Sequence, residues 1–439
     1  MAKIFEIKIE KMTQGGQGLG HLDGKVCFVN KAIPGETAKI EIVEDKKDYC
    51  VANPLEIIQA SPYRVNPECP IFNRCGGCQL QHISYEYQLV LKRDIFIETM
   101  SRIGKIEVTA DLPVAEAAFF YRNRTQLPVQ ESNGLKIGYF KPGTHRVVDQ
   151  KYCPINHDLI NRTLGVVRHR VVEAGVPAYD ERQHGGVLRH LAVKVGINTR
   201  QLFVTFVTTG QELDRRLYHD LHLALPETVG ITQNINPGRT NRVLGSENRL
   251  LWGNDYYEER VDGFIYHIRT ASFFQVNTRV FERILKTIRE RLTLAGNEVV
   301  LDLYSGVGVI GSSLSARVRE VVAIEENKET VEDGIASARA NGIANIRFIT
   351  GDVAEKLGEI EGGDIAILDP PRKGVEKVIF DRLARFPIKK IVYLSCNPAT
   401  FARDAGFLKI QNYDLSEVII FDMFPQTFHM ETLGFFRKT

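Results

Sequence analysis

Between residues 298 and 394 the chain alternates short apolar segments with helical ones, and this pattern constrains the fold more than any other feature. The apolar segments predict strands at 298–303, 320–324, 346–349, 364–368 and 390–394, with helices extending to residues 316 and 341 after the first two. Strands that alternate with helices build parallel βαβ units, in which helices cover both faces of one sheet. We therefore predict a doubly wound, mainly parallel α/β sheet of Rossmann-like type.

Acidic residues and glycines gather where these predicted strands end. The first strand leads into a glycine-rich turn, and carboxylates occur on four successive strands: Asp302, before Gly306 and Gly308, then Glu325, Asp352 and Asp369. Glycines let the backbone approach a ligand, and an acid after the second strand can bind the ribose of an adenosine ligand. Four carboxylates would repel a pyrophosphate and attract a sulfonium ion, so the pattern favours S-adenosylmethionine over a dinucleotide.

The fifth predicted strand delivers a cysteine to a sharp turn, Ser395-Cys396-Asn397-Pro398. A reactive side chain is often placed at such a turn at the edge of an α/β sheet. Free cysteine is also among the most buried residue types. This segment alone leaves a nucleophile and a packed structural thiol equally open.

Four other cysteines predict a metal centre. Cys69, Cys75 and Cys78 are close in sequence, and Cys153 would come from the following region. Four thiolates suit a [4Fe-4S] cluster or tetrahedral zinc, and the spacing departs from that of paired zinc knuckles. We favour iron. The remaining two, Cys27 and Cys50, are expected to be packed thiols.

The rest of the chain predicts two further domains before the catalytic one. Residues 1–60 have the short strands and glycine turns of a small all-β barrel similar to oligonucleotide-binding folds, which serve nucleic-acid or protein contacts; we favour nucleic acid. Residues 61–268 are expected to form an α+β central domain, with strands at 138–140, 188–196 and 201–207 and a helix near 84–102 that is expected to pack on the catalytic domain, residues 269–439.

Composition and charge bear on where the protein is located, but they do not identify its substrate. The chain has 439 residues and a formal net charge of +2, so its global charge says little about a polyanionic partner, and the local distribution of charge must carry that argument. Basic and aromatic residues are interleaved at 119–124 and 136–146, which suits nucleic acid or simply a solvated face. There is no apolar run of about 18 residues and no signal-peptide pattern, so we expect a cytoplasmic protein without a membrane span. No obligate protein partner is inferred.

Four motifs together resemble the RNA uracil-5 methyltransferase family, in particular its branch acting on 23S ribosomal RNA. They are Asp302-Leu-Tyr-Ser-Gly-Val-Gly308, Asp369-Pro-Pro-Arg-Lys-Gly374, Ser395-Cys-Asn-Pro398 and His429-Met-Glu431. The resemblance spans nearly the whole chain. It implies an N-terminal TRAM domain that binds RNA, a class I methyltransferase domain, S-adenosylmethionine as methyl donor and an iron-sulfur site at the four cysteines.

The resemblance also implies roles for individual residues. Cys396 would be the nucleophile and Glu431 the base, while the residues around the donor or the target base would be Gln275, Tyr304, Gly306, Glu325, Asp352 and Asp369. Phe273 is our candidate for stacking on the target base, with Arg124 as a further substrate contact. Val309 stands where many relatives have asparagine. For Glu431 a surface or helix-cap position, and for Phe273 a core position, are the structural alternatives.

The expected reaction is methylation of uracil C5 after a thiolate adds to C6, which turns the unreactive ring into an enolate. The target base must leave its stack to reach the thiol. Three alternatives remain at this point. The substrate could be transfer RNA, the chain could be an inactive RNA-binding assembly factor, or it could methylate an amino group, although enzymes of that class have an aromatic residue where this chain has Arg372.

Overall fold

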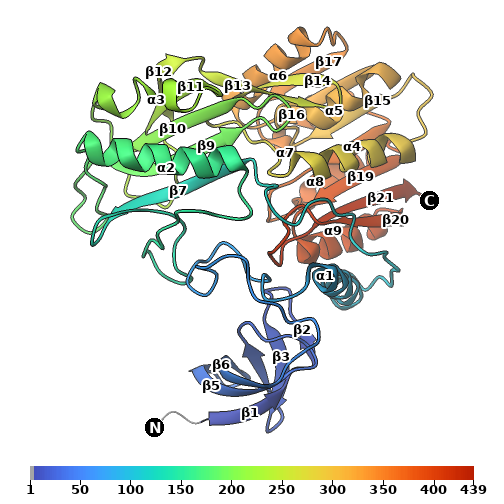
Figure 1. Ribbon diagram of the computed structural model, residues 1–439. Coiled ribbons are helices and arrows are strands. Elements are labelled where there is room, and N and C mark those ends of the chain that lie inside the picture. The colour runs from blue at the N-terminus through green and yellow to red at the C-terminus, as the bar shows by residue number, and fades with distance from the viewer. Residues whose placement is uncertain (1–3) are drawn as a thin grey trace.

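The computed structural model describes residues 4–439, which form three regions (Figure 1). A small barrel stands at one end, and the central domain and the C-terminal sheet lie side by side above it. Residues 1–3, which the sequence assigns to the start of the barrel, lie outside the described residues.

The N-terminal region is a six-stranded sheet in the order β1-β5-β6-β4-β3-β2, as expected for a small β barrel. Its strands are β1 (Ile4–Lys8), β2 (Lys11–Met12), β3 (Gly18–Leu22), β4 (Lys25–Val29), β5 (Thr37–Asp45) and β6 (Tyr49–Gln59). Alternation places Ala38 and Ile40 inside, together with Cys27 and Cys50, which are 0% and 1% exposed. Both cysteines are therefore packed thiols, as predicted.

A connecting segment carries three of the clustered cysteines and the helix α1 (Tyr85–Thr99), which continues as a π-helical turn η1 (Met100–Gly104). α1 packs against a helix of the C-terminal domain, α9 (Pro398–Ile410). The fully buried Lys92 of α1 also forms an ion pair with Asp422 of that domain, with Nζ 2.6 Å from Oδ1. The segment is thus joined to the catalytic domain by both apolar and charged contacts.

The central domain is a six-stranded sheet in the order β12-β11-β10-β9-β7-β8, covered by helices α2 and α3. Its elements are β7 (Arg124–Glu131), β8 (Leu135–Ile137), α2 (Asp158–Glu173), β9 (Leu188–Val195), β10 (Leu202–Thr208), η2 (Arg215–Leu217), α3 (Leu221–Ala224), β11 (Thr228–Ile235) and β12 (Glu247–Gly253). The prediction of a strand at 138–140 is wrong, because the chain leaves the sheet at Ile137. Gly138 then packs so closely against the Val148 carbonyl that a Cβ would collide with it.

The C-terminal domain is a seven-stranded sheet in the order β17-β16-β15-β18-β19-β21-β20. Its strands are β15 (Val299–Leu303), β16 (Glu320–Glu325), β17 (Ile346–Thr350), β18 (Ile365–Leu368), β19 (Lys390–Ser395), β20 (Tyr413–Phe421) and β21 (Glu431–Lys438). The first five are parallel and confirm the predicted doubly wound sheet, whereas β21 pairs antiparallel with both β19 and β20.

Helices flank this sheet, and a β-hairpin precedes it. The remaining elements are β13 (Tyr256–Val261), β14 (Phe264–Arg269), α4 (Thr278–Arg291), α5 (Val309–Leu314), η3 (Ser315–Arg317), α6 (Lys328–Ala340), α7 (Val353–Lys356) and α8 (Lys377–Leu383). The central parallel strands are buried on both faces, as strands under two helical layers must be: all residues of β15 and β18 are buried, whereas the edge strand β17 has none. Within residues 4–439 no helix has the length and apolarity needed to cross a bilayer.

Candidate active site

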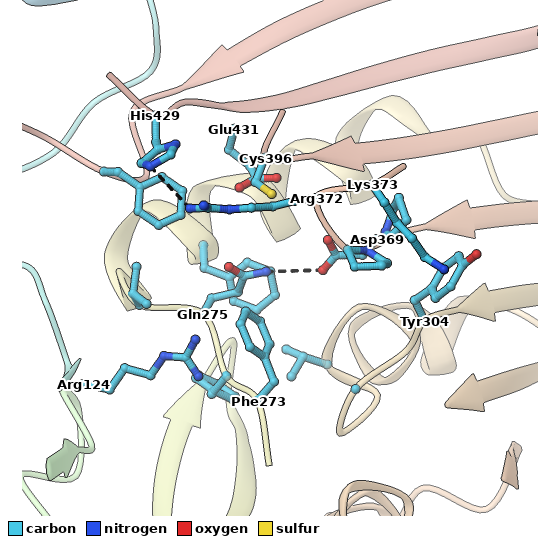
Figure 2. A pocket seen from close by; sticks show the side chains of 18 of the residues that line it. Arg124, Phe273, Gln275, Tyr304, Asp369, Arg372, Lys373, Cys396, His429 and Glu431 are labelled. Atoms are coloured by element: carbon cyan, nitrogen blue, oxygen red, sulfur yellow. Dashed lines mark hydrogen bonds between the residues drawn. The ribbon is translucent and has the colours of Figure 1, made fainter. Parts of the chain in front are cut away.

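A cavity of about 770 Å³ opens at the carboxyl edge of the parallel strands, between the C-terminal sheet and the central domain (Figure 2). This is the edge at which open α/β sheets bind their ligands. The cavity brings together every predicted catalytic, donor and substrate residue: Arg124, Phe273, Gln275, Tyr304, Gly306, Glu325, Asp352, Asp369, Cys396 and Glu431.

Cys396 and Glu431 lie side by side because of strand register. Ser395, the last residue of β19, pairs with Thr432 of the antiparallel strand β21. Cys396, which follows Ser395, therefore lies opposite Glu431, which precedes Thr432. The Asn397 side chain then turns the chain into α9 by accepting a hydrogen bond from the Ala399 N–H. Cys396 is partly exposed to the cavity, whereas Glu431 is only 2% exposed. The surface and helix-cap alternatives for Glu431 are therefore wrong: it begins a buried strand.

The environment favours the neutral forms of both groups. Burial, and then the Glu431 charge, raise the pKa of the Cys396 thiol to about 11. Burial, with the nearby Asp369, raises the pKa of Glu431 well above its usual range. The Arg372 guanidinium opposes both shifts. A carboxyl group with a raised pKa is a stronger base once ionised, which suits proton abstraction from carbon.

The glycine-rich turn and its carboxylates form the other half of the cavity. Glu325 accepts a hydrogen bond from the Gly306 N–H at 3.1 Å, so the turn after β15 and the end of β16 are tied together. Gly306 has a φ of +55°, a conformation that glycine adopts without strain. Asp352 is exposed at the end of β17, where it also caps α7. Glu325 and Asp352 remain accessible to a ligand, as donor binding requires.

Asp302 differs from the expectation that it lies at a strand tip. It belongs to the interior of β15, is 1% exposed, and accepts a hydrogen bond from the Gly311 N–H at 2.9 Å. Burial raises its pKa to about 8. Asp302 therefore holds the start of α5 through Gly311, and it lines the cavity from a more buried position than Glu325 and Asp352.

Asp369 directly follows β18 and is oriented by Gln275, whose Nε2 donates to its Oδ2 at 3.2 Å (Figure 2). Burial raises the pKa of Asp369 to about 7 although this hydrogen bond opposes the shift. Tyr304 and Val309 line the same cavity on the side of the glycine-rich turn. Val309 has no polar side-chain atom, so it can make only an apolar contact there.

Phe273 and Arg124 form the wall contributed by the central domain and the segment before α4. Phe273 is 50% exposed, which rules out the core position. The guanidinium carbon of Arg124 lies 4.4 Å from the centre of its ring, and burial lowers the Arg124 pKa to about 10. An aromatic ring and a guanidinium arranged in this way suit a planar base and its phosphate.

The four clustered cysteines surround a second, smaller cavity. Cys69, Cys75, Cys78 and Cys153 all line it, as does Gln150, whose buried side-chain amide has no hydrogen-bond partner. Within the described chain, no three histidine, cysteine, aspartate or glutamate side chains are grouped closely enough to hold one metal ion. The thiols thus converge from two separate segments as predicted, but they are not arranged as the ligands of one ion.

Sequence reasoning missed two residues of the site, Arg372 and His429. Both line the cavity, and Arg372 Nη2 lies 3.3 Å from His429 Nε2 (Figure 2). The only signal for them was their presence in the Asp-Pro-Pro-Arg and His-Met-Glu motifs, and nothing in either motif shows that the two side chains meet.

Comparison with known proteins agrees with this geometry. The tRNA (Uracil-5-)-methyltransferase family matches residues 242–439, and the TRAM domain matches residues 2–55. Uncharacterized RNA methyltransferases of Halalkalibacterium halodurans and Clostridium tetani are each 37% identical over 98% of this chain and over 96% and 95% of their own length.

One solved structure is similar over almost the entire chain. It is the Pyrococcus abyssi tRNA (uracil-54, C5)-methyltransferase in complex with S-adenosyl-L-homocysteine, with a TM-score of 0.81, 29% sequence identity, and coverage of 98% of this chain and 100% of that one. The chain therefore belongs to the RNA uracil-5 methyltransferase family and is an S-adenosylmethionine-dependent RNA methyltransferase with an N-terminal TRAM domain.

Proposed function

We propose that this enzyme methylates C5 of a specific uridine in 23S ribosomal RNA through a covalent bond between Cys396 and C6 of the target base. The observation that carries the proposal is the pairing of β19 with β21, which places a partly exposed thiol beside a buried carboxyl in one cavity. An inactive RNA-binding assembly factor would not require a thiol and a carboxyl group side by side in a cavity. Transfer of a methyl group to an exocyclic amine needs no thiol nucleophile.

In the proposed reaction the Cys396 sulfur adds to C6 of the uracil, and the ring electrons move onto the C4 carbonyl oxygen as an enolate. The bound donor supplies an electrophilic methyl group, which C5 takes. Glu431 then removes the proton from C5, and the returning electron pair expels the Cys396 sulfur as thiolate. Arg372 stabilises the thiolate at both ends of the cycle, since its charge lowers the pKa of the Cys396 thiol.

The other cavity residues divide between the two substrates. Glu325 and Asp352 would bind the ribose and the adenine of the donor, with Gly306 and Tyr304 along it. Gln275 and Asp369, which hydrogen-bond to each other, offer an amide and a carboxyl to the polar edge of the uracil. Phe273 would stack on the flipped base and Arg124 would bind its backbone.

Transfer RNA is the second candidate substrate, because the P. abyssi relative is a tRNA (uracil-54, C5)-methyltransferase. We favour ribosomal RNA because the four cysteines accompany the TRAM domain and the Ser-Cys-Asn-Pro motif in this chain, a combination that resembles the ribosomal branch. The TRAM domain would supply a second RNA contact beyond the cavity.

We also propose that the four cysteines hold a [4Fe-4S] cluster. The residues fit such a group: four thiols line one small cavity, and the unpaired Gln150 amide can donate to a cluster sulfur. A cubane cluster separates its four thiolates more widely than a single zinc ion, which needs sulfurs about 4 Å apart. The cluster would supply cross-links between residues 69–78 and 153, since methyl transfer needs no electron.

The direct test is methylation of defined transcripts with a labelled donor, followed by mass mapping of the modified nucleoside. Fragments of 23S ribosomal RNA should gain 5-methyluridine at one uridine, whereas unmodified transfer RNA should not, and Cys396→Ala should abolish the reaction. Methylation of transfer RNA alone would replace the ribosomal assignment with the second candidate. Turnover by Cys396→Ala equal to wild type would refute the covalent mechanism.

A further inference from the structure

The catalytic cavity contains one cation next to the proposed nucleophile and base. Arg372 follows Asp369-Pro370-Pro371, a rigid turn, and its carbonyl accepts a hydrogen bond from the Asn397 side chain at 3.2 Å. This fixes where the Arg372 side chain begins. Its guanidinium, however, stands at the end of a long flexible side chain, and the residue is exposed. Such a group keeps one position only if a partner holds it.

That partner is His429. Across residues 4–439, its Nε2 is the one side-chain atom that hydrogen-bonds to the Arg372 guanidinium, and Arg372 forms no ion pair. In Figure 2 the Arg372 side chain passes beside Cys396 and Glu431 and ends at the imidazole ring. Because a guanidinium can only donate, Nε2 must accept, and the proton of the neutral ring is on Nδ1.

The position of His429 is itself determined by its surroundings. The ring packs on Phe428, with ring centres 4.2 Å apart, and on Phe424 at 5.8 Å. The His429 N–H donates to Thr427 Oγ1 at 3.2 Å. The imidazole is therefore a fixed acceptor at the end of the loop that leads into β21.

The charge of the ring agrees with this role. Burial, followed by the charges of Arg372, Lys92 and Arg122, lowers the pKa of His429 to about 4. The imidazole is then neutral throughout the physiological range and its Nε2 lone pair is free to accept. A protonated ring would instead repel the guanidinium.

The guanidinium matters because the other ionisable side chains that act on the Cys396 thiol are carboxyl groups, which oppose ionisation of the thiol when they are charged. Glu431 on β21 and Asp369 at the end of β18 both oppose ionisation of the thiol, and Arg372 favours it. An arginine free to move into solvent would be farther from the sulfur and screened by water. The hydrogen bond to His429 therefore determines how much of that stabilisation reaches Cys396.

We propose that His429 is a positioning residue that holds the Arg372 guanidinium beside the Cys396 thiol and thereby promotes formation of the thiolate nucleophile. The proposal rests on the proposed role of Cys396 and adds to it a residue that acts on the thiol through Arg372. The hydrogen bond that the neutral His429 ring accepts would then help to determine the reactivity of the Cys396 thiol.

The experiment measures alkylation of Cys396 by iodoacetamide as a function of pH in the full-length protein, with the modified peptide quantified by mass spectrometry. It needs neither RNA nor methyl donor. His429→Asn and His429→Gln form a matched pair, because the amide of asparagine occupies the place of Nδ1 and that of glutamine can reach the place of Nε2. Arg372→Met and the double variant His429→Asn/Arg372→Met complete a cycle, and Phe428→Leu tests packing without the hydrogen bond.

We expect His429→Asn to raise the apparent pKa of Cys396 by about half to one unit, as loss of a nearby opposite charge does at a partly exposed site. His429→Gln and Phe428→Leu should stay close to wild type. The double variant should shift no more than Arg372→Met alone, because both changes remove one interaction. In methylation assays kcat of His429→Asn should fall at neutral pH and recover at alkaline pH, with KM for RNA unchanged.

An alkylation profile of His429→Asn identical to wild type would overturn the proposal. So would equal shifts in the asparagine and glutamine variants, or full additivity with Arg372→Met. These outcomes are separate from failure of the proposed function, which is judged by methylation with Cys396→Ala. If His429→Asn does not fold, Arg372→Met and His429→Gln still carry the test, and an unshifted Arg372→Met profile refutes it.

Discussion

Replacing Glu431 with glutamine should trap the enzyme on its RNA. Glutamine has the shape of glutamate but cannot take a proton from carbon, so the step that releases Cys396 is the one that fails. The first step, addition of the Cys396 sulfur to the base, should not become slower. After burial, the charge of Glu431 is the largest influence that raises the pKa of Cys396, and the substitution removes it. The variant therefore forms the covalent bond at least as readily as wild type and breaks it slowly.

The size of the effect depends on how well the neighbouring groups of the cavity can replace this base. Asp369 already accepts from Gln275 at 3.2 Å, and His429 Nε2 is taken by Arg372. Loss of a positioned general base typically slows its step by about 10²–10⁴-fold. If methyl transfer and release have comparable rates in wild type, a 10²-fold slower release leaves about 99% of the reacted enzyme as adduct.

The assay is a denaturing gel with end-labelled RNA and methyl donor, in which the adduct migrates as a band of protein size. The double variant Cys396→Ala/Glu431→Gln is the control and should show no band. Addition of protease should release the label. If Glu431→Gln loses turnover but never forms the band, Glu431 does not act after the covalent bond, and the proposed order of addition, methyl transfer and proton removal is refuted.

Three further outcomes are expected. Glu325→Ala should raise KM for S-adenosylmethionine about 10- to 100-fold, as loss of a charged hydrogen-bonding partner does, while KM for RNA stays constant; an unchanged donor KM contradicts its role. Lys92→Met should destabilise the chain by about 3–5 kcal/mol because it leaves the fully buried Asp422 without its 2.6 Å partner, seen as a lower thermal midpoint, and the further change Asp422→Leu should recover much of the loss. Cys78→Ser should abolish a visible absorption band and bound iron, about four atoms per chain in wild type by elemental analysis; stoichiometric zinc instead would contradict the cluster.

The parallel part of the C-terminal sheet could be predicted because its local signals agree with its tertiary environment. β15 and β19 lie under helices on both faces, so they are mostly apolar runs, and the helices between strands have the lengths that crossovers need. Glu325 and Asp369 could be assigned to one cavity for the same reason. Carboxyl ends of parallel strands meet at one edge whatever the detail of packing.

The two antiparallel strands could not be predicted in this way. β21 contains Gly434, which weakens a strand signal, and the residue is required because a Cβ there would approach Phe401 to 2.6 Å. It lies between β20, the strand before it in the chain, and β19, from which α9 and β20 separate it in sequence. The contact between Arg372 and His429 has the same origin, since it joins residues 57 positions apart through the fold alone.

The direction of β21 explains how two distant motifs form one catalytic pair. A parallel strand at this position would present its last residue to the cavity, but β21 runs against β19 and therefore presents its first, Glu431, beside the turn that carries Cys396. Because side chains alternate along a strand, a slip of one residue would turn Glu431 to the opposite face and bring Thr432 towards the thiol. The buried packing of Phe436 against Phe401, with ring centres 6.1 Å apart, opposes such a slip. The core that fixes the register of this strand thus also fixes the distance between the nucleophile and the base.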